Sequence, residues 1–257
     1  MRSAWHPTSR GTLTVHLVNP AELHVRLAQD IAQRLSAAID ARGSAVLSVS
    51  GGKSPVPLFE ALRVIDMGWS HVRITLVDER CVPCTHPDSN ARLVHTHLLQ
   101  GLAAKAHLVG MIDSASSPLA APSELAHSAG QALRAAGTAD VLVLGMGADG
   151  HTASLFPDAL NLADALDRHN SQTCVAMTLK NPPASAPYAR LTQTLAQILS
   201  SRHIVLPLSG ADKLHTLQQA WSHATPTLPI SLVLQQSQTP LALWLAHEDL
   251  LAESSTT

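Results

Sequence analysis

The stretch Asp140-Val-Leu-Val-Leu144 is an almost uninterrupted apolar run of five residues. Such a run is typical of a strand in a parallel sheet whose two faces are both covered, because neither face then presents polar side chains to water. A polar, glycine-rich segment, Gly-Met-Gly-Ala-Asp-Gly-His, follows at once over residues 145–151. We therefore predict a buried central strand that ends in a loop suited to binding a ligand.

Segments typical of strands and helices alternate on both sides of this run. Leucine and isoleucine recur every four residues from Leu23 to Ile39, between a helix-start signal at Asn19-Pro20 and a stop signal at Gly43. Further strands are predicted at 13–18, 45–49, 72–77, 173–179, 203–208 and 241–245, and helices at 55–62, 90–99, 123–136 and 211–221. The alternation implies right-handed crossovers and predicts the α/β class, with an open, mostly parallel, doubly wound sheet and helices on both faces.

Length and composition narrow the class of protein. The 257 residues, 46% of them hydrophobic, suffice for one such domain over residues 1–257. A formal net charge of −2 and only 2 Phe, 4 Trp and 1 Tyr argue against a nucleic-acid partner.

No apolar run reaches the roughly 18 residues of a membrane span, and no signal-peptide core precedes the first strand. The odd set of cysteines, Cys81, Cys84 and Cys174, suits a reducing compartment. We expect a cytoplasmic monomer or small homo-oligomer that binds a small molecule and no membrane.

The loop after the central strand has two interpretations. Gly145, Gly147 and Gly150 satisfy the G-x-G-x-x-G fingerprint of dinucleotide-binding proteins. That fingerprint requires a long helix after the third glycine, and Pro157 interrupts the chain seven residues later. The alternative is that the glycines allow close approach to a small ligand while Asp149 and His151 face it. A histidine beside a carboxylate suits general base catalysis, because the unperturbed imidazole pKa is about 6.5.

The segment Ser50-Gly51-Gly52-Lys53-Ser54-Pro55 is a glycine turn between a predicted strand and a predicted helix. The exposed N–H groups of such a turn can bind an anion. It is not a Walker A motif, because Leu47 stands where that motif has its first glycine. The phosphate of a small sugar is therefore a better ligand for it than a nucleotide, and a plain strand-to-helix turn is the alternative.

Cys81-Val-Pro-Cys84 is a C-x-x-C sequence, followed by His86, His95 and His97. A redox pair or a zinc site would use such residues. A zinc site would more typically include a second close pair, and two histidines two residues apart on a helix point to different faces. We therefore interpret the cysteines as reduced thiols in a loop and predict no metal.

Four blocks of sequence, in this order along the chain, resemble the 6-phosphogluconolactonase family. They are Ser50-Gly-Gly-Lys-Ser-Pro55, Val77-Asp-Glu-Arg-Cys-Val-Pro83 with Ser89-Asn90, Gly145-Met-Gly-Ala-Asp-Gly-His-Thr-Ala-Ser-Leu-Phe-Pro157, and Gly210-Ala-Asp-Lys213. The third block is specific. The family is related to glucosamine-6-phosphate deaminases and isomerases, which share its fold and its aspartate-glycine-histidine loop.

The resemblance implies a Rossmann-like α/β domain, no organic cofactor, and hydrolysis of 6-phospho-D-glucono-1,5-lactone to 6-phospho-D-gluconate in the oxidative pentose phosphate pathway. It implies that His151 is the general base and that Asp78 and Asp149 are the active-site carboxylates. The family's phosphate-binding basic residues fall on Arg80, Arg190 and Lys213, and we expect the phosphate to be held by them together with the turn of Ser50, Gly51 and Gly52. Lys53 is counted with them, although the family usually has a small polar or other residue there.

Phe156 distinguishes the lactonases from the related deaminases. The deaminases have a glutamate of their proton relay at this position, and a phenyl ring cannot carry protons. Simple hydrolysis needs no such relay, so Phe156 favours the lactonase. A sensor that binds a sugar phosphate without turnover is a further alternative, disfavoured because His151 and both aspartates are present.

Overall fold

The computed structural model describes residues 5–112, 120–181 and 187–246, without the side chains of residues 211 and 212. Its main feature is a parallel sheet of seven strands in the order β1-β10-β9-β6-β2-β3-β5. These strands are β1 (Leu13–Val18), β2 (Ala45–Val49), β3 (Val72–Leu76), β5 (His107–Val109), β6 (Val141–Val143), β9 (Ile204–Leu208) and β10 (Leu241–Ala246). The predicted central strand is β6, which lies between β9 and β2.

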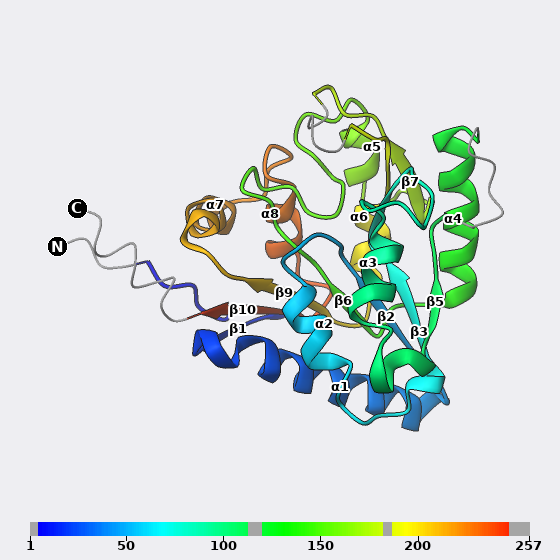
Figure 1. Cartoon of the computed structure of the whole chain (residues 1–257). Helices are drawn as coiled ribbons and strands as arrows, with labels where there is room; N and C mark the ends of the chain where they lie inside the picture. The colour runs from blue at the N-terminus through cyan, green and yellow to red at the C-terminus, as the bar shows by residue number, and fades with distance from the viewer. Residues whose placement is uncertain (1–4, 113–119, 182–186, 247–257) are drawn as a thin grey trace.

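Helices connect the strands and cover the sheet (Figure 1). They are α1 (Leu23–Arg42), α2 (Val56–Leu62), α3 (Asn90–His97), α4 (Pro122–Ala136), α5 (Leu162–Leu166), α6 (Leu195–Leu199), α7 (Ala211–Ser222) and α8 (Pro229–Leu234). The predicted start at Asn19-Pro20 opens a short 3-10 turn (Pro20–Glu22), in which the Asn19 side chain accepts a hydrogen bond from Ala21 N, and α1 follows this turn directly. The predicted stop is in place, because Gly43 ends α1 in the left-handed conformation.

Two apolar clusters occupy the two faces of the sheet. Along β2, β6, β9 and β10, alternate residues belong to different clusters, because neighbouring side chains of a strand point to opposite faces. The first cluster includes α1 and α2, and the second includes α6, α7 and α8. This arrangement confirms the predicted α/β class with a mostly parallel sheet and helices on both faces. Within the described ranges, no helix is both long and apolar enough to cross a membrane.

A second, antiparallel sheet was not predicted. It consists of β4 (Asp78–Arg80), β8 (Arg190–Gln193) and β7 (Cys174–Met177), in the order β4-β8-β7. The strand predicted at 173–179 is β7, so it pairs in this small sheet and not in the large one. The two sheets join at Val77, which donates its N–H to Val49 O at 2.9 Å and accepts from Gln193 N at 2.8 Å. Strands of three or four residues give no periodic pattern, which explains why β4 and β8 were missed.

One buried histidine at the amino-terminal edge of the sheet should make stability depend on pH. His203, which precedes β9, is 8% exposed. Burial, followed by the charge of Arg34, lowers the pKa of its imidazole to about 4 from 6.5. Between these values the unfolded chain binds a proton that the folded chain does not, so the free energy of unfolding should fall as pH drops from 6.5 toward 4. The loss should be on the order of 3 kcal/mol.

Denaturant unfolding at several pH values tests this expectation. His203→Gln, which cannot titrate, should flatten the dependence over this range, whereas His169→Ala, a change at an exposed loop histidine, should leave it intact. An equal slope in His203→Gln and the unaltered protein would show that other groups cause the loss.

Candidate active site

A pocket of about 220 Å³ lies at the carboxyl ends of the parallel strands, and many of the side chains that line it are polar. Loops that follow β2, β6 and β9 contribute to it, as do the first residues of α1. The other lining residues include Asp78 and Arg80 of β4, Asn90 of α3, Arg190 of β8 and Lys213 of α7. Parallel sheets of this kind bind ligands at the edge formed by the carboxyl ends of their strands, at the point where the chain leaves two neighbouring strands toward opposite faces of the sheet. The pocket is smaller than the roughly 300–1,000 Å³ of sites for drug-sized ligands, so it suits a small metabolite.

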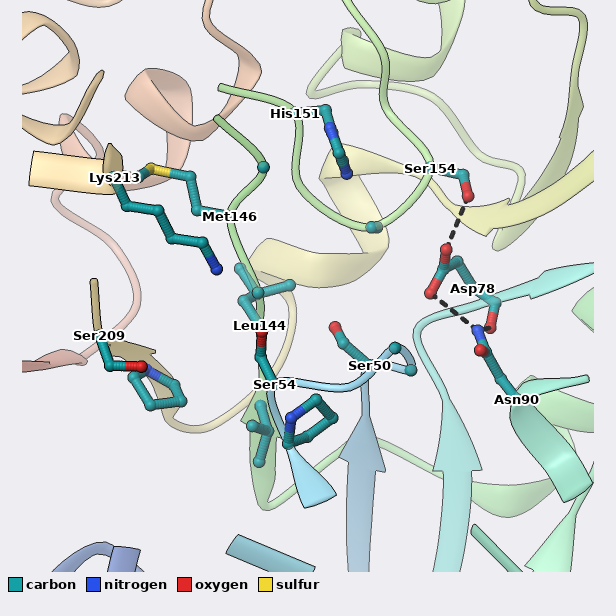
Figure 2. Close-up of a pocket in the computed structure, with 18 of the residues that line it drawn as sticks. Ser50, Ser54, Asp78, Asn90, Leu144, Met146, His151, Ser154, Ser209 and Lys213 are labelled. Carbon is teal, nitrogen blue, oxygen red and sulfur yellow. Dashed lines mark hydrogen bonds between the residues drawn. The ribbon is translucent and has the colours of Figure 1, made fainter. Parts of the chain in front are cut away.

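The turn after β2 forms the floor of the pocket and requires its glycines. A Cβ atom on Gly51 would lie 1.8 Å from Asn90 Oδ1, and Gly52 has a φ of +86°. Ser50 Oγ is buried and has no hydrogen-bond partner among the described residues, and in Figure 2 it lies between Lys213 and Asp78. Ser50, Gly51 and Gly52 all line the pocket, whereas Lys53 is exposed and does not.

Asp78 is fixed by two side chains from distant parts of the sequence (Figure 2). Ser154 Oγ donates a hydrogen bond to Asp78 Oδ2 at 2.6 Å. Asn90 Nδ2 donates to the Asp78 backbone oxygen at 2.8 Å and to Oδ1 at 3.3 Å. All three residues are buried and line the pocket. The carboxylate is therefore held in one orientation at the edge of the ligand space.

Glu79 anchors the segment that carries Asn90. Its carboxylate accepts hydrogen bonds from the backbone N–H groups of Arg80, Asn90 and Ala91 and from Ser89 Oγ, at 2.7 to 3.0 Å. Burial raises the pKa of Glu79, and the four donors oppose that effect. Because three of these donors, on Ser89, Asn90 and Ala91, belong to the N-cap and first turn of α3, Glu79 fixes the start of this helix and thereby the position of Asn90.

Arg80 and Arg190 meet across the small antiparallel sheet. They are register partners on β4 and β8, and both line the pocket. Arg190 is 4% exposed, and burial, together with the charge of Arg80, lowers the pKa of its guanidinium while Asp78 acts in the opposite sense. Arg80 also donates a hydrogen bond to the backbone oxygen of Asp88. The two guanidinium groups thus form a cationic site beside Asp78.

His151 projects into the pocket from the loop after β6, in the direction of Ser50 (Figure 2). Its Nδ1 lies 2.5 Å from Asp149 Oδ1, and its backbone N–H donates to the same oxygen at 3.1 Å. Burial opposes ionisation of Asp149, but the hydrogen bond and the charge of His151 outweigh it and lower the pKa of this carboxyl. Asp149 is exposed and lies outside the pocket lining. It contacts the imidazole at Nδ1, and none of the described residues forms a hydrogen bond with Nε2, which can therefore meet a ligand or a water.

The loop that carries His151 is held by α7 and α8, which belong to the second apolar cluster of the sheet. Thr216 Oγ1 of α7 donates to Ala148 O at 2.6 Å, and Ile230 N of α8 donates to Gly150 O at 3.0 Å. Gly147 gives the imidazole its space, since a Cβ atom there would lie 2.2 Å from the ring. Gly147 is therefore explained by the space that the His151 ring needs, and the glycine does not require a dinucleotide ligand.

Lys213 reaches the pocket from the first turn of α7. Ser209, which lies between β9 and α7, also lines the pocket. Figure 2 shows the amino group of Lys213 directed toward the pocket, on the side away from Asp78. The strand order β9-β6-β2-β3 explains this separation, because Lys213 follows β9 whereas Arg80 follows β3. The three predicted basic residues therefore do not form one cluster. They flank the Ser50–Gly52 turn from two sides.

Several residues that line the pocket had no predicted binding or catalytic role, namely His24, Asn90, Ser154, Phe156 and Ser209. Three of them, Asn90, Ser154 and Phe156, lie inside the quoted motifs, and this membership was the available signal. The cysteines lie elsewhere. Burial, followed by the charge of Glu79, raises the pKa of Cys81 to about 11, which is the opposite of a reactive thiol. The described residues contain no group of three or more side chains arranged to hold a metal.

Comparison with known proteins places this chain in a family. The model of glucosamine-6-phosphate isomerases and 6-phosphogluconolactonases matches residues 6–243. A 6-phosphogluconolactonase of Pseudomonas putida is 45% identical over 204 residues, which are 79% of this chain and 81% of that protein. One of Neisseria meningitidis serogroup A is 40% identical over 218 residues, 84% of this chain and 91% of that protein. The crystal structure of a 6-phosphogluconolactonase from Shewanella baltica has a TM-score of 0.82 at 39% identity, covering 92% of this chain and 98% of that one. The chain therefore belongs to the glucosamine-6-phosphate isomerase/6-phosphogluconolactonase family.

Proposed function

We propose that this protein is a 6-phosphogluconolactonase, which hydrolyses 6-phospho-D-glucono-1,5-lactone to 6-phospho-D-gluconate with His151 as the general base. The observation that carries the proposal is the imidazole in the pocket whose Nδ1 is engaged by Asp149 at 2.5 Å. This contact favours the tautomer with the proton on Nδ1, so that Nε2 can accept a proton. We place the reaction in the cytoplasm, in the oxidative pentose phosphate pathway.

In the proposed mechanism, a water attacks the lactone carbonyl carbon, C1, while His151 Nε2 takes one of its protons. The bond between C1 and the ring oxygen then breaks, and the imidazolium returns the proton to that oxygen. Asp149 stabilises the imidazolium and holds its orientation, as the carboxylate of a hydrolytic triad does. The products are a carboxylic acid at C1, which loses its proton to the solvent at neutral pH to give the carboxylate, and a free hydroxyl, and no covalent intermediate with the protein is required.

The phosphate of the substrate is proposed to lie over the Ser50–Gly52 turn. Backbone N–H groups of such a turn suit an anion, and Arg80 with Arg190 on one side and Lys213 on the other can donate charge-assisted hydrogen bonds. Asp78 is proposed to accept hydrogen bonds from the water or from sugar hydroxyls, because Ser154 and Asn90 hold its carboxylate in place. The remaining length of the ligand then reaches toward His151.

The family also contains aminosugar isomerases, so the first test must separate the two reactions. Deamination with isomerisation needs a relay of titratable groups, whereas lactone hydrolysis needs one base and a water. Phe156, which lines the pocket beside His151, cannot serve in such a relay. We expect the purified protein to hydrolyse 6-phosphogluconolactone, to release no ammonia from glucosamine 6-phosphate, and to keep its lactonase rate in EDTA.

Both substrates are assayed on one preparation, with the spontaneous opening of the lactone subtracted. Ammonia release at a rate comparable to lactone hydrolysis would contradict the proposal. A protein that binds 6-phosphogluconate without accelerating lactone hydrolysis would be a sensor, and loss of activity in EDTA with recovery in zinc would require a metal mechanism.

A further inference from the structure

The imidazole of His151 is covered by the ring of Phe156. The two ring centroids lie 4.3 Å apart, with an angle of 31° between the ring planes. Phe156 is partly buried against the apolar cluster around α6, α7 and α8, and it also lines the pocket. One side of its ring is therefore fixed by the core while the other contacts the proposed base.

A tight turn in the backbone brings these two rings together. Thr152 and Leu155 form an antiparallel bridge, in which Leu155 N donates to Thr152 O at 3.0 Å. Between them Ala153 has a φ of 52°, a left-handed conformation that is costly for a residue other than glycine. Thr152 Oγ1 donates to Gly145 O at 2.8 Å and ties the turn to the end of β6. Residues 151 and 156 flank the bridge, so their side chains meet.

Three contacts restrict the imidazole in different directions. Asp149 engages its Nδ1 edge, Gly147 packs so closely that any side chain there would collide with the ring, and Phe156 covers a face. A hydrogen bond alone would leave the ring free to tilt about the bond to Cβ. The aromatic face removes that freedom, and it also attracts the imidazolium that exists once the water proton has been taken.

We propose that Phe156 is a positioning residue for the catalytic base: it holds the His151 imidazole in the orientation that directs Nε2 at the water, and it stabilises the imidazolium in the transition state. The inference rests on the proposed function, in which His151 is the base. It goes further because it gives Phe156 a role in the reaction. The difference from the deaminases says only that Phe156 is not a glutamate.

The test compares Phe156→Leu with Phe156→Tyr. Leucine keeps an apolar side chain but removes the aromatic face, so kcat should fall roughly threefold to thirtyfold, the range of a cation–π contact, while KM changes less than twofold. Tyrosine keeps the ring and should restore most of kcat. In a His151→Ala background the same leucine substitution should cause no further loss, because the two residues act as one unit.

The matched control is Phe59→Leu, the same chemical change at a fully buried core position outside the pocket. It should lower the melting temperature and leave kcat unchanged at a temperature where it is folded. A raised KM with unchanged kcat in Phe156→Leu would overturn the proposal, since Phe156 would then only shape the pocket wall. An equal loss in the presence and absence of His151 would also overturn it.

A measurement without turnover separates this inference from the proposed function. The ring protons of His151, assigned by their loss in His151→Ala, should show an aromatic ring-current shift in the NMR spectrum that disappears in Phe156→Leu and persists in Phe156→Tyr. Failure of lactone hydrolysis with this shift present would contradict the function and leave the positioning contact standing. An unaltered His151 signal in Phe156→Leu would contradict the contact itself.

Discussion

His151→Ala is expected to lower kcat by roughly 10² to 10⁴, the usual contribution of a positioned acid or base, while the fold and substrate binding are retained. The loop does not depend on the imidazole for its shape, because Thr216, Ile230 and the Thr152–Leu155 bridge hold its backbone. The alanine variant would lose the proton acceptor and leave the phosphate site intact. The effect should therefore fall on kcat and not on KM.

Initial rates of lactone opening measure this effect, with a blank at the same pH because the lactone also opens spontaneously. His169→Ala serves as the matched control, since His169 is an exposed histidine outside the pocket, and its rate should equal that of the unaltered protein. Turnover close to the unaltered rate in His151→Ala would remove His151 from the role of base. Another pocket group, with Asp78 as the first candidate, would then have to take the proton.

The parts of the site that depend on neighbours in sequence could be predicted. Asp149 and His151 are two residues apart, and their hydrogen bond forms within one loop. The strand before this loop was recognisable from its apolar run, and the predicted 45–49 strand matches β2. In a parallel sheet the direction of each strand then fixes the edge at which its following loop lies, so the location of the pocket followed from the order of elements.

The parts that depend on tertiary pairing could not be predicted. Ser154 contacts Asp78 across 76 residues of sequence, and Arg80 meets Arg190 only because the short β4 and β8 pair. No local pattern encodes such a contact, since the side chains gain their partners from folding of the whole chain. The same reason applies to Lys53, which was grouped with the phosphate-binding residues: its place in the turn was evident from the sequence, but whether it lines the pocket depends on the folded backbone, in which Gly52 has a φ of +86°.

Lys213→Ala should raise the KM for the phosphorylated lactone by roughly tenfold to a hundredfold, corresponding to the loss of a charge-assisted hydrogen bond of about 1.5 to 3 kcal/mol. Lys213 is the cleaner choice for this test than Arg80, whose guanidinium also donates to Asp88 O and so supports the local backbone. The loss should appear mainly in KM, because the phosphate is bound equally in the ground state and the transition state.

Unphosphorylated glucono-1,5-lactone provides the decisive comparison. It lacks the group that Lys213 is proposed to bind, so it should be a poor substrate of the unaltered protein, and Lys213→Ala should lose little further activity on it. Lys105→Ala, at an exposed lysine far from the pocket lining, controls for the general effect of removing a positive charge. If Lys213→Ala loses as much activity on the unphosphorylated lactone as on the phosphorylated one, Lys213 acts on the part that the two substrates share. The phosphate would then be left to the Ser50–Gly52 turn with Arg80 and Arg190 alone.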